Sequence, residues 1–66
     1  MPIKVRDLIQ ILERDGWSQI AQKGSHRQFK HPVKRGKVTV PGKLSEELPL
    51  GTWKSILRQA ELEDQS

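Results

Sequence analysis

The sequence of 66 residues contains no cysteine, and its only aromatic residues are one phenylalanine and two tryptophans. Without cysteine there is no disulfide bond, no thiolate nucleophile and no cysteine-ligated zinc. No apolar run approaches the roughly 20 residues of a membrane-spanning helix, and the N-terminus lacks the apolar core of a signal peptide. We therefore expect a domain that has no membrane partner and is located in the cytoplasm.

Acidic residues are missing from the whole middle of the chain, between Asp15 and Glu46. The same segment contains both histidines and seven basic residues, namely Lys23, Arg27, Lys30, Lys34, Arg35, Lys37 and Lys43. The net charge of +4 is therefore concentrated in one region. Such a region favours an anionic partner such as the phosphates of a nucleic acid. A basic surface that only keeps the protein in solution is the alternative interpretation.

A chain of this length forms one small domain, which buries only about 60% of the surface that its unfolded form exposes. Its apolar fraction of 33% is low but sufficient for two helices packed on one sheet. The chain has no internal repeat, low-complexity tract or linker, so we assign residues 1–66 to a single domain. We expect residues 63–66 to be a frayed tail.

Two segments have the periodicity of amphipathic helices. Between Val5 and Asp15 apolar residues recur at spacings of three, four and seven, and Gly16 occupies the position of a left-handed C-cap residue. The second segment begins with Pro49, which we place at the first helical position because its missing N–H is not needed there. Its apolar stripe consists of Trp53, Ile56, Leu57 and Ala60.

Three short strands are predicted between the helices, over Trp17–Lys23, His26–His31 and Lys37–Val40. The turns that join them are Gly24-Ser25 and residues 32–36. Because the strands are close in sequence and the turns are short, we expect an antiparallel meander.

The element order is therefore α-β-β-β-α, an α+β fold in which both helices cover the same face of a three-stranded antiparallel sheet. Phe29 must point inward, which sends the alternate residues of its strand to the uncovered face. That face is expected to display His26, Gln28, Lys30, Lys37 and Thr39. It has no aromatic residue on which bases can stack, but it offers contacts to phosphate and ribose.

The Gly24-Ser25 turn places His26 at the start of a strand, with the sheet on one side and solvent on the other. Histidine titrates near neutral pH without help from its environment, so this position suits proton transfer. The alternative is an ordinary hairpin turn followed by an ordinary edge histidine.

Four segments are informative in combination: Gly16-Trp17, Gly24-Ser25-His26-Arg27, Val38-Thr39-Val40-Pro41 and the helical segment from Leu48 to Ala60. Together they resemble the HicA-type mRNA interferases, which are the toxins of bacterial toxin–antitoxin pairs. The resemblance implies a fold like the double-stranded-RNA-binding domain, ribosome-independent cleavage of mRNA, and neutralisation by a HicB-type antitoxin. The single catalytic histidine of these toxins corresponds to His26.

Two positions depart from the pattern of these toxins. Lys43 stands near the place where many relatives have a histidine after the third strand, which removes a second titrating group. Glu61 replaces a glycine that closes the last helix in many relatives, so we expect this helix to run on past Ala60. Neither departure affects His26.

A ribonuclease that works without a metal needs a base for the 2′-hydroxyl, positive charge for the developing phosphorane and a proton for the leaving oxygen. We predict that His26 is the base, with neither metal nor cofactor, because no cluster of ligand-type residues is visible. His31 falls on the opposite face of its strand and is predicted to be structural, so the acid is left open between water and a lysine. The predicted RNA-binding residues are Lys23, Gly24, Ser25, Arg27, Gln28, Lys30 and Lys37.

Two other functions are compatible with the same residues. The chain can be a non-catalytic module that binds RNA through the basic face. Alternatively, this face serves chiefly to dock the antitoxin, and an acidic partner that covers His26 would then neutralise a nuclease by occlusion.

Overall fold

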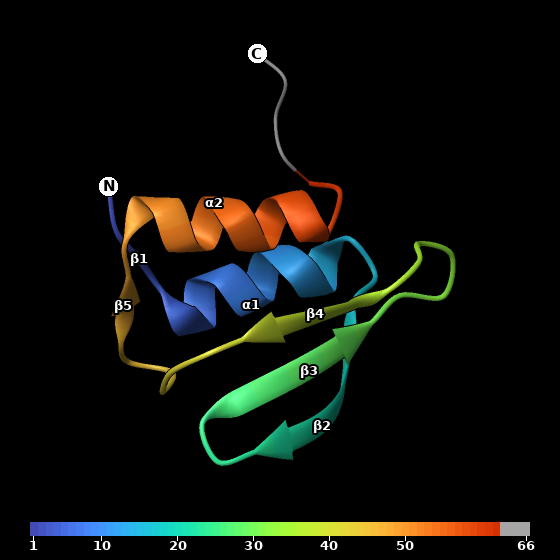
Figure 1. Cartoon of the computed structure of the whole chain (residues 1–66), viewed down its shortest axis with the longest axis horizontal. Helices are drawn as coiled ribbons and strands as arrows, with labels where there is room; N and C mark the ends of the chain where they lie inside the picture. Colours follow the sequence, from blue (N-terminus) through green and yellow to red (C-terminus); the bar gives the residue numbers. More distant parts are fainter. Residues whose placement is uncertain (63–66) are drawn as a thin grey trace.

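The computed structural model describes residues 1–62, and its main elements follow the predicted α-β-β-β-α order (Figure 1). Helices α1 and α2 span Val5–Arg14 and Leu50–Gln59. Strands β2, β3 and β4 span Ser18–Lys23, His26–Lys30 and Lys37–Val40. The α+β fold class is thus confirmed, whereas the tail predicted at residues 63–66 lies outside the described residues.

A second, two-stranded sheet joins the start of α1 to the segment that precedes α2. Strand β1 (Ile3–Lys4) pairs antiparallel with strand β5 (Glu47–Leu48). Beside this pair, the backbone N–H of Val5 donates a hydrogen bond of 2.9 Å to the carbonyl of Glu46. Strands of two residues are too short to show a period of two, so the sequence pattern did not predict them.

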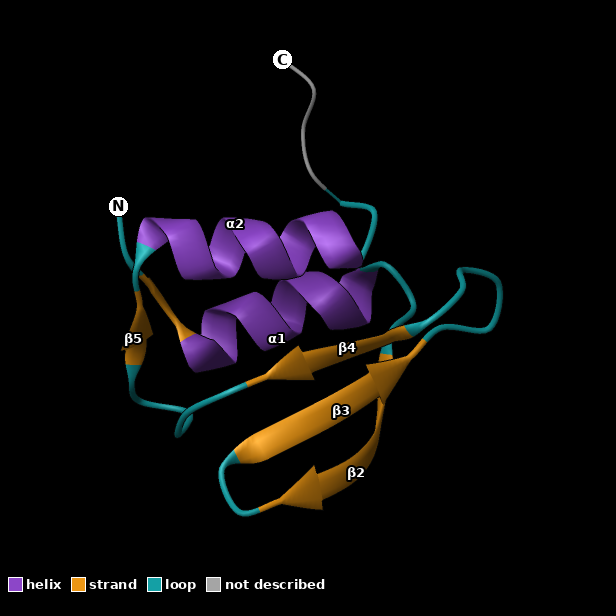
Figure 2. Cartoon of the chain, in the orientation of Figure 1, coloured by secondary structure: helices purple, strands orange, loops and turns teal. Residues whose placement is uncertain are grey.

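The main sheet has the order β2-β3-β4 and is antiparallel throughout (Figure 2). Between β3 and β4, Phe29 lies opposite Val38 and Gln28 lies opposite Thr39. The register between β2 and β3 shifts at Ile20, where the free edge of the sheet is therefore irregular. Such bulges discourage unwanted pairing at an exposed edge strand.

Two predicted strands are one residue too long at one end. Strand β2 begins after Trp17, and β3 ends before His31. The rings of these two residues instead contact each other between the end of α1 and the loop after β3. They meet edge to face, with centroids 5.3 Å apart. Tertiary contacts, rather than the sheet ladder, hold these two side chains.

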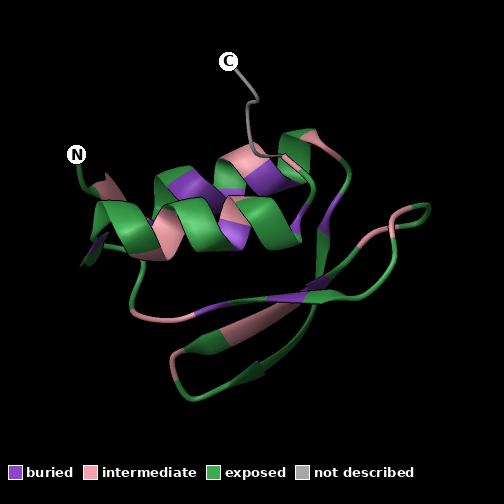
Figure 3. Ribbon diagram, turned by 45° about the horizontal axis from the view of Figure 1, so that its top comes forward, coloured by how far each residue is buried: buried purple, intermediate pink, exposed green. Residues whose placement is uncertain are grey.

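Both helices lie on the same side of the main sheet, as predicted, and the other face of the sheet is uncovered (Figure 3). In β4 the side chains of Val38 and Val40 are buried, whereas those of Lys37 and Thr39 are exposed. Burial of one such apolar side chain stabilises a fold by roughly 1.5–3 kcal/mol. The core consists of Val5, Leu8, Ile9, Leu12, Trp17, Phe29, Val38, Val40, Leu48, Ile56 and Ala60.

Helix α1 ends at Gly16 in the manner that the sequence predicts. Gly16 has a φ of +105°, and its N–H donates to the carbonyl of Glu13 at 3.0 Å. The N–H of Trp17 donates to the carbonyl of Leu12, also at 3.0 Å. These two bonds form the Schellman motif, in which a left-handed residue closes the last turn of a helix.

Helix α2 ends in the same motif without a glycine. The N–H of Leu62 donates to the carbonyl of Leu57 at 2.8 Å, and the N–H of Glu61 donates to that of Arg58 at 3.1 Å. Glu61 has a φ of +57°. The prediction that α2 runs past Ala60 is therefore wrong: Glu61 adopts the left-handed conformation, at a cost of about 1 kcal/mol relative to glycine.

The start of α2 also differs slightly from the prediction. Pro49 is the N-cap residue rather than the first helical residue, with φ −65° and ψ 158°. Its carbonyl accepts hydrogen bonds from the N–H groups of Thr52 and Trp53, at 3.0 and 3.1 Å. The proline ring suits either position, because neither requires an N–H group in the helix.

Candidate functional site

The hairpin between β2 and β3 forms one end of the candidate site. Its loop contains only Gly24 and Ser25, and Lys23 lies directly opposite His26 on the two strands. Gly24 has a φ of +60° and Ser25 a negative φ, the pattern of a type II′ turn, which matches the twist of the strands. The side-chain amide of Gln22 donates to the carbonyl of Gly24 at 3.0 Å. The predicted turn is confirmed.

His26 is exposed on the uncovered face of the sheet, on the opposite side from the buried Phe29. Within residues 1–62, its ring makes no hydrogen bond to another protein group. Both ring nitrogens are therefore accessible to a molecule on this face. An imidazole in this position can accept a proton from such a molecule or donate one to it.

A row of polar side chains continues from His26 across the uncovered face. Gln28 lies two residues after His26 in β3 and faces Thr39 of β4. Lys30 lies two residues further along β3 and faces Lys37. Lysines directly opposite each other on one sheet face repel, and a bound anion removes this repulsion. Ser18 and Ala21 of β2 also lie opposite this row, while its larger polar side chains are Lys23, His26, Gln28, Lys30, Lys37 and Thr39. We refer to them as the open-face set.

Arg27 is one of the predicted RNA-binding residues, but its side chain lies on the helix-facing side of β3. It lies opposite Val40, whose side chain is buried, and its Nη1 donates a hydrogen bond of 2.9 Å to the carbonyl of Gly42. Gly42 has a φ of +89°, and a Cβ atom added there would lie 3.1 Å from a carboxylate oxygen of Glu46. Arg27 therefore holds the loop after β4 against the end of the sheet, and the structure does not place its guanidinium among the open-face set.

The second histidine, His31, has a hydrogen-bond partner at each ring nitrogen. Its Nε2 lies 2.6 Å from the carbonyl of Asp15 and is therefore the protonated nitrogen, since a carbonyl can only accept. Its Nδ1 accepts hydrogen bonds from the N–H groups of Val33 and Lys34, both at 3.0 Å. Its side chain is only 10% exposed. The geometry agrees with the predicted structural role.

Lys34 contacts the same two residues, His31 and Asp15. Its ammonium donates to the carboxylate of Asp15 at 2.5 Å and to the carbonyls of Ala60 and Glu61 at 3.0 and 3.2 Å. A cation at this place stabilises the carbonyl end of α2. The hydrogen bond from Lys34 also lowers the pKa of the Asp15 carboxyl below its usual value of 3.8. Although Lys34 adds to the basic composition of the middle segment, its charge is already compensated within the fold.

No sequence signal pointed to this role of Lys34. Asp15 and Lys34 are 19 residues apart, and Ala60 is a further 26 residues along the chain. A pattern of neighbouring residues carries no information on contacts of this range. We call this cluster of Asp15, Gly16, Trp17, His31 and Lys34 the junction.

The residues that commonly bind metals do not gather in the described structure. Within residues 1–62, no group of three or more histidine, cysteine, aspartate or glutamate residues is placed so as to hold a metal ion. Neither α1 nor α2, the helices of this part of the chain, has the length and apolar character needed to cross a bilayer.

The fold and the site together define a small α+β domain with two helices behind a three-stranded sheet and a histidine on the uncovered, positively charged face. The sequence of one protein family, described as HicA toxin of bacterial toxin–antitoxin, matches residues 5–62. The chain therefore belongs to the HicA toxin family, and its role is that of the toxin in such a pair. A search of curated proteins found no match.

Proposed function

We propose that this toxin is a metal-independent endoribonuclease that cleaves mRNA in the cytoplasm, with His26 as the general base. The observation that carries the proposal is the position of His26. It is exposed on the uncovered face, has no protein partner within residues 1–62, and shares that face with Lys23 directly opposite it and with Lys30 and Lys37 further along. An imidazole with no structural task is available for chemistry, and the lysines attract the phosphates of RNA.

In the proposed reaction, His26 removes the proton from a ribose 2′-hydroxyl, and the 2′-oxygen attacks the adjacent phosphorus. The bond between phosphorus and the 5′-oxygen of the next nucleotide breaks. This oxygen takes a proton from water or from a lysine, and His26 later returns its proton to the solvent. The products are a 2′,3′-cyclic phosphate and a 5′-hydroxyl end. A positioned base of this kind accelerates a reaction by about 10²- to 10⁴-fold.

The charge that develops on the phosphorane needs cations or N–H groups nearby. Lys23, directly opposite His26, is the nearest candidate in the register. The backbone N–H groups of Gly24 and Ser25 are further candidates in the turn. Lys30 and Lys37 are placed to bind flanking phosphates together with Gln28. Arg27 contributes through its charge from the helix-facing side of the same strand.

The test is cleavage of a purified mRNA by the wild-type protein and by His26→Ala, in the presence of a metal chelator. We expect the substitution to reduce the cleavage rate by at least 10²-fold. The melting temperature should stay the same because the side chain is exposed. Lys54→Ala, an exposed substitution on α2, is the control and should cleave at the wild-type rate. Cleavage by His26→Ala at the wild-type rate would refute the role of the histidine.

A non-catalytic RNA-binding module is the second candidate, and the facing lysines Lys30 and Lys37 support it, since they bind phosphate whether or not cleavage follows. This candidate predicts RNA affinity that falls steeply with salt and is unchanged in His26→Ala. RNA that stays intact during hours of incubation with the wild-type protein would favour it over the nuclease.

We also propose that the antitoxin is of the HicB type and presents an acidic surface to the open-face set, so that RNA and antitoxin compete for one surface. Modification of His26 by an imidazole-specific reagent measures this competition, because His31 is nearly buried. Addition of the antitoxin should protect His26 from the reagent. A complex in which His26 reacts at the rate of the free toxin would contradict neutralisation by occlusion.

A further inference from the structure

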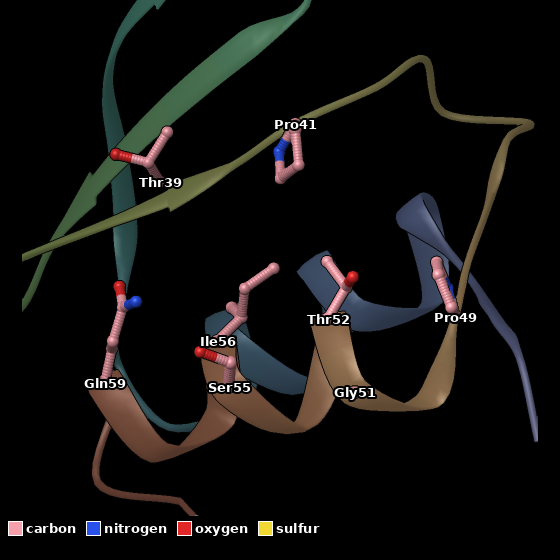
Figure 4. A pocket seen from close by; sticks show the side chains of 8 residues that line it. All are labelled: Thr39, Pro41, Pro49, Gly51, Thr52, Ser55, Ile56 and Gln59. Atoms are coloured by element: carbon pink, nitrogen blue, oxygen red, sulfur yellow. The ribbon is translucent and has the colours of Figure 1, made fainter.

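A cleft of about 510 Å³ lies between α2 and the end of β4 (Figure 4). Thr39 and Pro41 line it on the strand side, and Thr52, Ser55, Ile56 and Gln59 line it on the helix side. On α2, the polar lining residues recur at spacings of three and four, so they share one face of the helix. The cleft is open to solvent.

The lining of this cleft is uncharged, and its polar side chains come from α2. They are the hydroxyl groups of Thr52 and Ser55 and the side-chain amide of Gln59, whereas the side chain of Thr39 points away from α2 (Figure 4). Within residues 1–62, none of the side chains of Thr52, Ser55 and Gln59 makes a hydrogen bond to another protein group. Hydroxyl and amide groups both donate and accept, which suits sugars and bases. A phosphate would instead favour the lysines of the open face.

The cleft and the open face meet at Thr39 of the edge strand β4, whose side chain lies on the open face. Thr39 belongs to the open-face set, since it lies opposite Gln28, and it also lines the cleft. Gln28 is two residues from His26, or about 7 Å along the strand, and neighbouring strands are about 5 Å apart. The backbone of Thr39 is therefore roughly 8 Å from that of His26. One nucleotide is long enough to connect the two places.

We infer that this cleft is a subsite for the base and ribose of a nucleotide adjacent to the phosphate that is cleaved. The inference rests on the proposed RNA-cleaving function and adds residues of α2 to the substrate-binding surface. The lysines of the open face hold the phosphates, and the cleft receives the uncharged part of a neighbouring nucleotide.

The amide of Gln59 is the group best suited to distinguish bases. A glutamine amide presents a donor and an acceptor side by side, which can pair with the edge of a base. Ser55 is one turn earlier on the same helix face and can hydrogen-bond the ribose 2′-hydroxyl. The buried Ile56 and the ring of Pro41 form the apolar surface against which a base can pack. This subsite should therefore give the nuclease a nucleotide preference at one position beside the cut.

The experiment measures binding and cleavage separately. Short RNA oligonucleotides that differ at single positions are titrated against full-length His26→Ala, which should not cut them, and against this protein with Gln59→Ala or Ser55→Ala added. We expect the added substitutions to weaken binding of the preferred oligonucleotide by about 5- to 10-fold and to reduce the preference among bases. The matched control is Gln10→Ala, which removes an exposed glutamine from α1.

Each result decides the inference. Equal affinity and equal base preference with and without Gln59→Ala would overturn the subsite, even if the wild-type protein cuts RNA. If the wild-type protein binds RNA but does not cut it, the proposed function fails, and the binding data still decide the subsite. Absence of any RNA binding overturns both. If the substitutions weaken the antitoxin complex but not RNA binding, the cleft binds a segment of the partner protein and the inference is wrong.

Discussion

The two histidines lie five residues apart on the same hairpin, yet their surroundings are opposite. His31 is nearly buried, and each of its ring nitrogens is hydrogen-bonded within the junction. His26 is exposed on the open face and has no such partner within residues 1–62. The comparison shows how a structural imidazole differs from one that is available for a substrate: the first has its hydrogen-bonding capacity used by the fold.

The lysines repeat this contrast. Lys34 of the junction contacts a carboxylate and the carbonyl end of a helix. Lys30 and Lys37 face each other on the open face. One lysine stabilises the fold, whereas the other two have no ion-pair partner within residues 1–62, and a bound anion would relieve their repulsion. Composition alone counts all three as equal contributions to a basic segment.

The largest effect on stability should come from His31→Ala, with His26→Ala as its control. Loss of the His31 ring removes a nearly buried side chain and leaves two N–H groups and the carbonyl of Asp15 without their partner. We expect a loss of about 2–4 kcal/mol in the free energy of unfolding for His31→Ala, and less than about 0.5 kcal/mol for His26→Ala. Urea denaturation measures both. Equal losses would remove the distinction between the two histidines.

The next effect compares two glycines, one at the junction and one beside the open face. A Cβ atom at Gly16 would lie 2.8 Å from Nε2 of His31, whereas a Cβ at Gly24 would have no neighbour within 4 Å. Both residues have positive φ, so both substitutions to alanine cost backbone strain. We expect Gly16→Ala to lose about 2–3 kcal/mol and Gly24→Ala about 1 kcal/mol. A thermal melt in which Gly24→Ala is the less stable protein would contradict this order.

Acid should weaken the junction through Asp15. Lys34 lowers the pKa of this carboxyl in the folded protein. The ionised carboxylate therefore stabilises the fold at pH values above 3.8, which is the usual pKa of this carboxyl. This contribution decreases as the pH falls below 3.8 and is lost once the pH has passed the lower pKa of the folded state. In Lys34→Met this part of the pH dependence should be smaller. Melting temperatures between pH 7 and pH 2 measure it, and parallel curves for the two proteins would contradict the role of Lys34.

The smallest effect should be a gain from Glu61→Gly. Glu61 closes α2 with a φ of +57°, a conformation that glycine adopts without strain. We expect the free energy of unfolding to rise by about 0.5–1 kcal/mol. Calorimetry measures the gain. A decrease in stability would show that the Glu61 side chain makes a contribution larger than the strain.

Periodicity predicted the elements that bury apolar side chains. The stripe of Val5, Leu8 and Leu12 predicted α1, and the alternation of Lys37–Val40 predicted both β4 and its inward residues. The parity of Phe29 in turn placed His26 on the open face. These predictions succeeded because each depends on residues one to four positions apart, where the backbone geometry sets the direction of the side chain.

Other features were not predictable in this way. The prediction that α2 continues past Ala60 was wrong, because tertiary packing and the Schellman hydrogen bonds hold Glu61 in a left-handed conformation that a non-glycine residue disfavours. The pairing of β1 with β5 joins segments more than forty residues apart. The cleft beside α2 depends on how close that helix lies to β4. The spacing of its polar residues was visible in the sequence, but not the strand that faces them.

The sequence by itself determined the order of the elements, the buried face of each and the exposure of His26, because these follow from alternation between neighbouring residues. Only the tertiary structure decided which charges are free. It assigned Lys34 to the junction and the guanidinium of Arg27 to the carbonyl of Gly42, and it left Lys30 and Lys37 facing each other. Such assignments depend on which distant parts of the chain come into contact, and the spacing of neighbouring residues does not determine those contacts.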